Sequence, residues 1–202
     1  MVSVYDLKPK FQKLLRPLCG VLAAAGITAN QVTLAAVAIS MALGCAIFFT
    51  GGAKWTLLLL PPFIFVRMAL NAIDGMLARE FGQKSNLGAV LNELGDVVSD
   101  VALYLPFAVI PGVSPILVGL VVAIAVVTEM TGVIAVQIGA TRRYDGPFGK
   151  SDRALFFGAL ALALGTGIAP GFWTTVVLAL AAAAGVLTII NRVRAALAEA
   201  KP

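Results

Sequence analysis

Residues 71–100 read NAIDGMLAREFGQKSNLGAVLNELGDVVSD, and strongly apolar sequence lies on both sides of them, including WTLLLLPPFIFV at 55–66 and VALYLPFAVI at 101–110. The stretch contains the acidic residues Asp74, Glu80, Glu93, Asp96 and Asp100. The whole chain has only 10 aspartate and glutamate residues, so half of its acids lie here. Because charges within apolar segments are costly, this stretch is the first candidate for a functional site.

The composition of the chain is that of an integral membrane protein. Of its 202 residues, 60% are hydrophobic and 12% are charged, whereas a soluble domain has about 45–50% apolar and about 25% charged residues. The net charge of +5 does not indicate a nucleic-acid partner, because basic residues in membrane proteins commonly mark the cytoplasmic rim. The chain contains no histidine, which excludes histidine-based catalysis and predicts oxygen ligands for any metal.

Six stretches are long and apolar enough to cross a membrane, which takes about 20 residues each. They are 29–50, 54–79, 87–110, 114–140, 152–169 and 171–191. Turn-forming sequences separate them, such as EFGQKSN at 80–86 and PGVSP at 111–115. The predicted fold class is therefore an all-α integral membrane protein with six transmembrane helices, in a domain that covers residues 26–202.

The segment ahead of the first span, residues 1–25, predicts a helix that lies along the membrane surface. Its sequence YDLKPKFQKLLRPLCGVLAAA at 5–25 mixes basic and apolar residues in the manner of an interfacial amphipathic helix. We expect this helix to be interrupted near Pro9 and Pro17, because proline has no backbone N–H to donate and crowds the preceding turn.

Lysine and arginine residues predict the orientation of the spans. If the spans alternate in direction, nearly all basic residues fall on one side. These are Lys8, Lys10, Lys13 and Arg16 before the first span, Arg79 and Lys84 after the second, Arg142, Arg143, Lys150 and Arg153 after the fourth, and Arg192, Arg194 and Lys201 at the end. The positive-inside rule then predicts an inner (cytoplasmic) membrane protein with both termini and the acidic stretch on the cytoplasmic side.

Polar and small residues recur at helical spacing on the second and third spans. They are Asn71, Asp74 and Ala78 on the second, and Gly88, Asn92, Asp96 and Asp100 on the third. Residues three and four apart share a helix face, and the short turn makes the two helices antiparallel neighbours. We therefore expect the two polar faces to meet, with close approach of the two helices at the small residues Gly75, Ala78, Gly88 and Gly95.

Clustered carboxylates next to a membrane need a compensating cation or proton, because repulsion and lost hydration both oppose their charged state. Mg²⁺ takes oxygen ligands and commonly bridges carboxylates to substrate phosphates. The polar faces therefore predict a metal-and-phosphate site. On spacing alone, a polar seam between helices and a proton or ion pathway stay open as alternatives.

The motif DGMLAR at 74–79, with Gly88, Asn92 and Asp96 following at intervals of four, resembles the signature DxxDGxxAR(x)8GxxxDxxxD of the CDP-alcohol phosphotransferases, or CDP-alcohol phosphatidyltransferases. The sequence TANQVTL at 28–34 also resembles the start of the first span in that family. The chain departs from the signature at two of its four aspartates, where Asn71 and Asn92 stand. An asparagine supplies a carbonyl oxygen but no negative charge.

The resemblance implies an enzyme of phospholipid biosynthesis that depends on a divalent metal, Mg²⁺ or Mn²⁺. Such an enzyme transfers a phosphatidyl or other substituted phosphate group from a CDP-linked lipid such as CDP-diacylglycerol to an alcohol acceptor and releases CMP. The resemblance assigns metal binding to Asn71, Asp74, Asn92 and Asp96, and the role of general base to Asp96. It assigns binding of the cytidine diphosphate to Gly75, Ala78 and Arg79. It also suggests a homodimer.

The sequence TRRYDGPFGKSDR at 141–153 supplies candidate residues for binding the acceptor alcohol. They are the basic residues Arg142, Arg143, Lys150 and Arg153. Charged donors of this kind can hold a phosphate group on an acceptor. Basic loops are also common in membrane proteins in general, so this assignment has an ordinary structural alternative.

Arg67 lies inside the second span, where an isolated charge is costly. We expect it to pair with Asp100, since both residues lie one helical turn deeper than the polar site. Glu129 of the fourth span is the competing partner.

Three other classes of protein share some of these features. Asn71 and Asn92 are compatible with a non-catalytic or regulatory homologue whose metal site is degenerate. Intramembrane prenyltransferases also use acidic helices and Mg²⁺, but the DGMLAR motif and the number of spans argue against them. Charge placement alone also leaves transport open.

Overall fold

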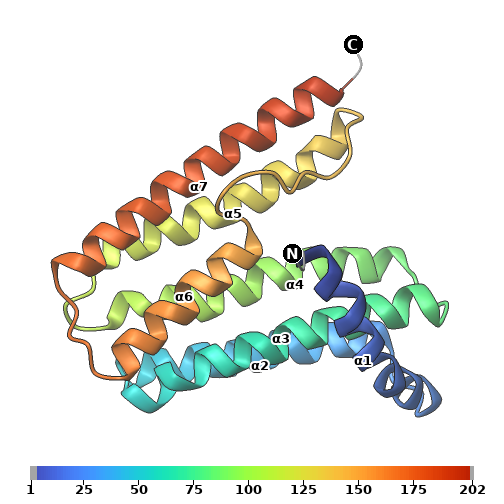
Figure 1. Cartoon of the computed structure of the whole chain (residues 1–202), viewed down its shortest axis with the longest axis horizontal. Helices are drawn as coiled ribbons and strands as arrows, with labels where there is room; N and C mark the ends of the chain where they lie inside the picture. Colours follow the sequence, from blue (N-terminus) through green and yellow to red (C-terminus); the bar gives the residue numbers. More distant parts are fainter. Residues whose placement is uncertain (1–3, 201–202) are drawn as a thin grey trace. The chain divides into compact units, whose positions relative to one another are not determined.

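The computed structural model describes residues 4–200, with side chains described from residue 11 onward. Over this range the chain consists of helices joined by turns and loops, and it contains no strand. The helices are α1 (Val4–Ala24), α2 (Ala29–Phe49), α3 (Lys54–Glu80), α4 (Asn86–Tyr104), the short 3₁₀ helix η1 (Leu105–Val109), α5 (Pro115–Gln137), α6 (Lys150–Gly165) and α7 (Phe172–Glu199) (Figure 1). The all-α prediction is confirmed for the described residues.

Four of these helices, α2, α3, α5 and α7, are long and apolar enough to cross a membrane. Of the remaining two predicted spans, 87–110 corresponds to α4 followed by η1, and 152–169 corresponds to most of α6 and the turn after it. Helix α6 has only 16 residues, and the 19 residues of α4 include three acids, Glu93, Asp96 and Asp100. A crossing by all six helices therefore stays a prediction.

The chain divides into two compact units, which are described separately. Unit 1 comprises Met1–Ala42 and Pro62–Ser99, and unit 2 comprises Leu43–Pro61 and Asp100–Pro202. Helices α2, α3 and α4 each contribute one segment to each unit. The division into an N-terminal segment 1–25 and a domain 26–202 stays a prediction.

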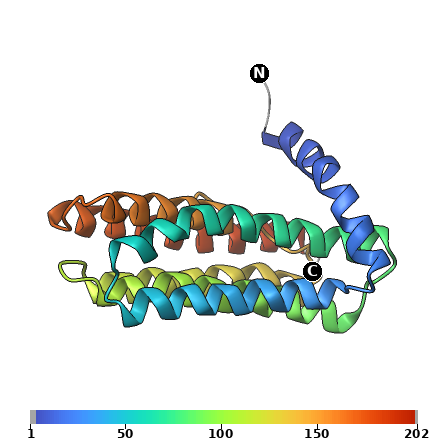
Figure 2. The ribbon, with the colours of Figure 1, turned by 90° about the horizontal axis from the view of Figure 1, so that it is seen from below.

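In unit 1, helix α1 is continuous from Val4 to Ala24, so the predicted interruption near Pro9 and Pro17 is wrong. A proline inside a helix removes one backbone hydrogen bond, and packing of the following turns offsets that loss. Cys19, two residues after Pro17, is fully buried. Figure 2 shows α1 turned away from the direction of α2. Its role as an interfacial helix stays a prediction.

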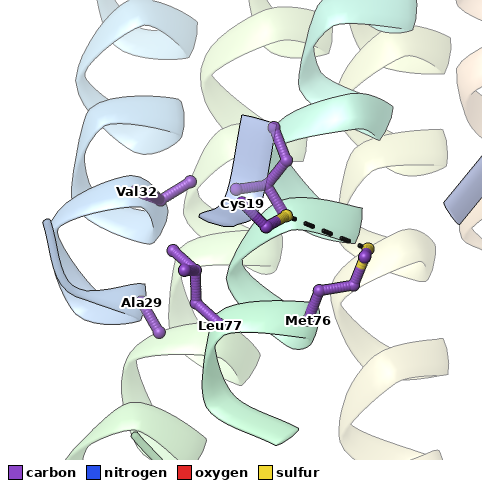
Figure 3. Packing of buried hydrophobic residues seen from close by; sticks show 6 residues of the cluster. Cys19, Ala29, Val32, Met76 and Leu77 are labelled. Carbon is purple, nitrogen blue, oxygen red and sulfur yellow. Dashed lines mark hydrogen bonds between the residues drawn. The ribbon is translucent and has the colours of Figure 1, made fainter. Parts of the chain in front are cut away.

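Two sets of contacts fix α1 to α3. Cys19 lies in an apolar cluster with Ala29, Val32, Ile73, Met76 and Leu77, and its Sγ is 4.0 Å from Sδ of Met76 (Figure 3). Arg16 donates two hydrogen bonds to the carboxylate of Glu80, at 2.9 and 3.0 Å. The apolar cluster occupies the face of α3 that carries Ile73, Met76 and Leu77.

In unit 2, helices α5 and α7 lie side by side, and the 138–149 loop runs back along them (Figure 1). The backbone N–H of Arg143 donates to the carbonyl of Gly132 in α5, at 3.2 Å. The backbone N–H of Phe148 donates to the hydroxyl of Thr188 in α7, at 2.9 Å. The loop is therefore held by hydrogen bonds to both helices.

Gly146 packs closely against Thr188 of α7, and Gly146→Ala is expected to loosen the loop. Its φ of 117° lies in the left-handed region, and an added Cβ would lie 2.6 Å from Cα of Thr188. Overpacking of this kind costs about 1–3 kcal/mol, so the melting temperature should fall by roughly 5 °C. Thermal unfolding of the purified protein in detergent measures this change.

Gly139→Ala is the matched control for Gly146→Ala. Gly139 also has a left-handed φ, of 80°, but an added Cβ there would meet nothing within 4 Å. This substitution carries the backbone strain without the steric contact. If both variants lose the same stability, contact between Gly146 and Thr188 is not what holds the loop.

Candidate functional site

Unit 1 contains a cavity of about 530 Å³ between α2, α3, α4 and the turn that joins α3 to α4. Its lining residues are Ala29, Asn30, Thr33, Asn71, Asp74, Gly75, Ala78, Arg79, Gln83, Lys84, Ser85, Asn86, Gly88, Ala89 and Asn92. Every residue that the sequence assigns to metal or nucleotide binding, with the exception of Asp96, therefore lines one cavity.

The turn between α3 and α4 is tied to the start of α2 through Gln83. Its side-chain Oε1 accepts a hydrogen bond from the backbone N–H of Ala29 at 2.7 Å, and its Nε2 donates to the carbonyl of Ile27 at 3.4 Å. This pair of contacts brings the first turn of α2 to the polar faces of α3 and α4. The residues of α2 that line the cavity were missed as site residues from the sequence, although they belong to the TANQVTL stretch.

Asp74 is buried, with 4% of its surface exposed. The hydroxyl of Thr33 donates a hydrogen bond to its Oδ2 at 2.8 Å. Thr33 therefore orients the Asp74 carboxylate at the wall of the cavity.

Asp96 is connected to the residues that line the cavity through Asn71, whose Nδ2 donates to Oδ1 of Asp96 at 3.2 Å. Arg67 lies on the same side. Its Nη2 donates to the backbone carbonyl of Asp96 at 3.0 Å and is 3.7 Å from Oδ1. The Asp96 side chain is therefore held from α3 by one amide and one guanidinium group. Pairing of Arg67 with Asp100 or Glu129 would join residues of different units and stays a prediction.

The predicted close approach at small residues involves α2 as well as α3. An added Cβ at Gly88 would lie 2.8 Å from Oδ1 of Asn30, and one at Gly95 would lie 2.9 Å from Cγ2 of Val37. Both neighbours belong to α2. The expectation that Gly88 and Gly95 allow close approach of α3 and α4 is therefore corrected, because these glycines pack against α2.

The side chains around the cavity fit a hard divalent cation by their chemistry. Asp74, Asp96 and the amide carbonyls of Asn71 and Asn92 are oxygen donors, which Mg²⁺ and Mn²⁺ accept. Among residues 11–200, no group of three or more acids or cysteines is placed to hold a metal ion. Asp74 and Asp96 together supply two formal negative charges.

The four basic residues predicted to bind the acceptor lie in unit 2, where Arg142 and Arg153 come together around Glu129. Nη2 of Arg142 is 3.1 Å from Oε2 of Glu129, and Nη2 of Arg153 is 2.9 Å from Oε1. Arg192 of α7 reaches the same carboxylate, with Nη1 3.5 Å from Oε1. From the sequence alone, Arg192 is expected only at the cytoplasmic rim. Arg192 and Glu129 lie far apart along the chain, and nothing in the sequence indicates that they contact each other. Lys150 begins α6 and is partly exposed.

Arg143 belongs to a separate ion-pair group at the surface. It donates to both carboxylate oxygens of Asp145, at 2.8 and 3.0 Å, and to Glu199 at 2.6 Å. The hydrogen bonds from Arg143 hold the pKa of Asp145 below its usual range. The structure therefore separates Arg143 from the cluster that contains Arg142 and Arg153.

Sequence comparisons with known proteins cover most of the chain. Residues 26–193 match the family model for CDP-alcohol phosphatidyltransferase. The chain is 46% identical over 198 residues to the inner membrane protein YnbA of Escherichia coli (strain K12), covering 97% of each chain.

Solved structures of phosphatidylinositol phosphate synthase from Mycobacterium tuberculosis have the same fold. The structure with CDP-DAG bound has a TM-score of 0.77 and 21% identity, covering 91% of this chain and 94% of the other. The structure in complex with manganese and citrate has a TM-score of 0.75 and 22% identity, covering 90% and 88%.

Proposed function

The chain belongs to the CDP-alcohol phosphatidyltransferase family, and from this membership we propose that it acts in phospholipid biosynthesis. It transfers a phosphatidyl or other substituted phosphate group from a CDP-linked lipid such as CDP-diacylglycerol to an alcohol acceptor and releases CMP. The E. coli relative is an inner membrane protein, which supports the same location here. The proposed topology has both termini and the cavity on the cytoplasmic side.

The observation that carries this proposal is the cavity in unit 1. Asn71, Asp74 and Asn92 supply oxygen atoms to it, while Arg79 and Lys84 supply positive charge. A nucleoside diphosphate needs both kinds of group: cationic donors for its phosphate oxygens, and carboxylates that hold a metal against them. Gly75 and Ala78 leave room at the same wall and, with Arg79, are the proposed residues for the cytidine diphosphate.

Asp96 is the proposed general base. Its carboxylate accepts the proton of the acceptor hydroxyl as the alcohol oxygen bonds to phosphorus, and the bond from phosphorus to the bridging oxygen of CMP breaks. Asn71 and Arg67 keep the carboxylate oriented during this step. Asn71, Asp74, Asn92 and Asp96 would hold a divalent cation, Mg²⁺ or Mn²⁺, which would neutralise the charge of the diphosphate.

The M. tuberculosis structures support two parts of the proposal by analogy. One has CDP-DAG bound, which favours a CDP-linked lipid as the donor, and one is in complex with manganese, which favours a divalent cation. A homodimer is also proposed, from the family alone. Arg142, Arg143, Lys150 and Arg153 are the proposed acceptor residues, although Arg142 and Arg153 form ion pairs with Glu129 in this structure.

Release of CMP by the purified protein tests the proposal. The protein is incubated with CDP-diacylglycerol, Mg²⁺ or Mn²⁺ and a panel of alcohols that includes glycerol, serine, inositol, inositol phosphate and glycerol 3-phosphate. CMP and a new lipid should appear together with at least one acceptor. Absence of turnover with every acceptor, together with absence of Mn²⁺ binding, would instead support a non-catalytic homologue.

Gly75→Ala tests the assignment of Arg79 to the diphosphate. An added Cβ at Gly75 would lie 2.9 Å from Nη2 of Arg79, so the guanidinium group must move. Alanine is favoured over glycine in a helix by about 1 kcal/mol, so stability should not fall. We expect the KM for CDP-diacylglycerol to rise roughly tenfold, the loss of about one charged hydrogen bond, while Mn²⁺ affinity stays unchanged. An unchanged KM would remove Arg79 from the donor site.

A further inference from the structure

Thr33 of α2 is a buried polar residue at the wall of the cavity in unit 1, and it lies outside the signature motif. It is 8% exposed, and its hydroxyl donates a hydrogen bond to Oδ2 of Asp74 at 2.8 Å. The hydroxyl oxygen also lies 3.1 Å from the backbone carbonyl oxygen of Ala29. A hydroxyl has one proton to donate, and the nearer acceptor, a carboxylate, forms the stronger bond.

The methyl group of Thr33 fixes the direction of this hydroxyl. A Cβ added at Gly95 of α4 would lie 3.5 Å from Cγ2 of Thr33, which is ordinary van der Waals contact. The methyl group therefore packs against α4 at the position of a glycine. Because threonine is branched at Cβ and stiff about χ1, a methyl group held against α4 directs the hydroxyl towards Asp74 of α3.

The backbone beneath Thr33 is held by groups other than Asp74. Ala29 lies one helical turn before Thr33, and its N–H donates to Oε1 of Gln83 at 2.7 Å. Nε2 of Gln83 donates to the carbonyl of Ile27 at 3.4 Å. The turn between α3 and α4 therefore fixes the start of α2. Both the backbone and the side-chain rotamer of Thr33 are set independently of the carboxylate that it contacts.

The orientation of Asp74 depends on such a contact. The last torsion of an aspartate side chain has a broad, roughly two-fold distribution, so the backbone alone does not fix the plane of the carboxylate. Carboxylates that bind metal ions are themselves hydrogen-bonded, and loss of such an outer partner typically costs about 10–100-fold in metal affinity. Thr33 supplies this kind of bond to Asp74.

We propose that Thr33 is a positioning residue for the divalent cation. It does not contact the cation, and it acts by holding the Asp74 carboxylate in the orientation that binds it. This inference rests on the proposed function, because that proposal makes Asp74 a metal ligand.

Titration calorimetry with Mn²⁺, in the absence of lipid substrates, tests the inference independently of turnover. Thr33→Val keeps the shape of the side chain and removes the hydroxyl, and should raise the Kd for Mn²⁺ by about 10–100-fold. Thr33→Ser restores the hydroxyl without the methyl group. Its side chain has three staggered rotamers available, so its Kd should lie within about threefold of the wild-type value.

Ser40→Ala is the matched control for the loss of a buried hydroxyl from the same helix. Ser40 is fully buried in α2, and its hydroxyl donates to the backbone carbonyl of Ala36 at 2.7 Å. This contact does not involve a proposed metal ligand. The control should therefore bind Mn²⁺ with the wild-type Kd, even if its melting temperature falls.

Four outcomes overturn the inference. The first is a folded Thr33→Val variant that binds Mn²⁺ as tightly as wild type, and the second is a Thr33→Ser variant that binds as weakly as Thr33→Val. The third is failure of both Thr33→Val and Thr33→Ala to fold, because the hydroxyl would then serve folding instead of the metal. The fourth is absence of saturable Mn²⁺ binding by the wild type. Absence of CMP release with every acceptor defeats the proposed function instead, while the calorimetry still reports on Thr33.

Discussion

Asp96→Asn is expected to lower CMP release by about 10²–10⁴-fold, which is the usual contribution of a positioned general base. Asparagine matches aspartate in shape but does not take up the acceptor proton near neutral pH. The contact of Arg67 with the backbone carbonyl of residue 96 does not depend on the side chain. The substitution should therefore leave the fold intact, and its kinetic effect should appear in kcat at saturating acceptor.

Glu93→Gln is the matched control for this variant. Glu93 is an acid on the same helix, and it is rotated by about 100° from Asn92. Its neutralisation should change CMP release by less than about twofold, because Glu93 is not among the residues proposed to bind the metal, the donor or the acceptor. Helical content and melting temperature are compared for both variants. If a folded Asp96→Asn protein retained more than a tenth of wild-type activity, another group would have to be the base.

The parts of the site that could be predicted from sequence are those set by the period of a single helix. Asn71, Asp74 and Ala78 share one face of α3, and Gly88 and Asn92 share one face of α4, so the meeting of these faces at one cavity follows from spacing and a short turn. The positions of the helices followed from apolar runs bounded by turn sequences.

Contacts between segments far apart in sequence could not be predicted in this way. The hydroxyl of Thr33 reaches Asp74 from another helix, and nothing in the spacing of either helix requires that contact. Glu129 and Arg192 meet because α5 and α7 lie side by side, which neither segment alone encodes. The continuity of α1 through Pro17 likewise depends on burial of Cys19 against Met76, a tertiary contact that outweighs a local preference.

Asn71→Asp combined with Asn92→Asp is expected to raise the affinity for Mn²⁺ by about 10²-fold. Each substitution adds a carboxylate to a site whose present charge comes from Asp74 and Asp96, and a gain of about 1.4 kcal/mol for each added charge corresponds to a factor of ten. The amide of Asn71 now donates to Oδ1 of Asp96 at 3.2 Å. A carboxylate at position 71 replaces that donor with a like charge, so the variant should be less stable than wild type in a chelator.

Calorimetric titration with Mn²⁺ and melting curves with and without Mn²⁺ measure both effects in the same preparation. Because a ligand that binds only the folded state stabilises it in proportion to RT ln(1 + [L]/Kd), the gain in melting temperature on adding Mn²⁺ should exceed that of the wild type. Asn86→Asp is the control, since Asn86 lines the same cavity outside the signature positions. An unchanged Mn²⁺ affinity in the double variant, or an equal gain in the control, would show that residues 71 and 92 do not reach the metal. The two asparagines would then not lower the negative charge around the metal. The hypothesis of a non-catalytic homologue with a degenerate metal site would lose its physical basis.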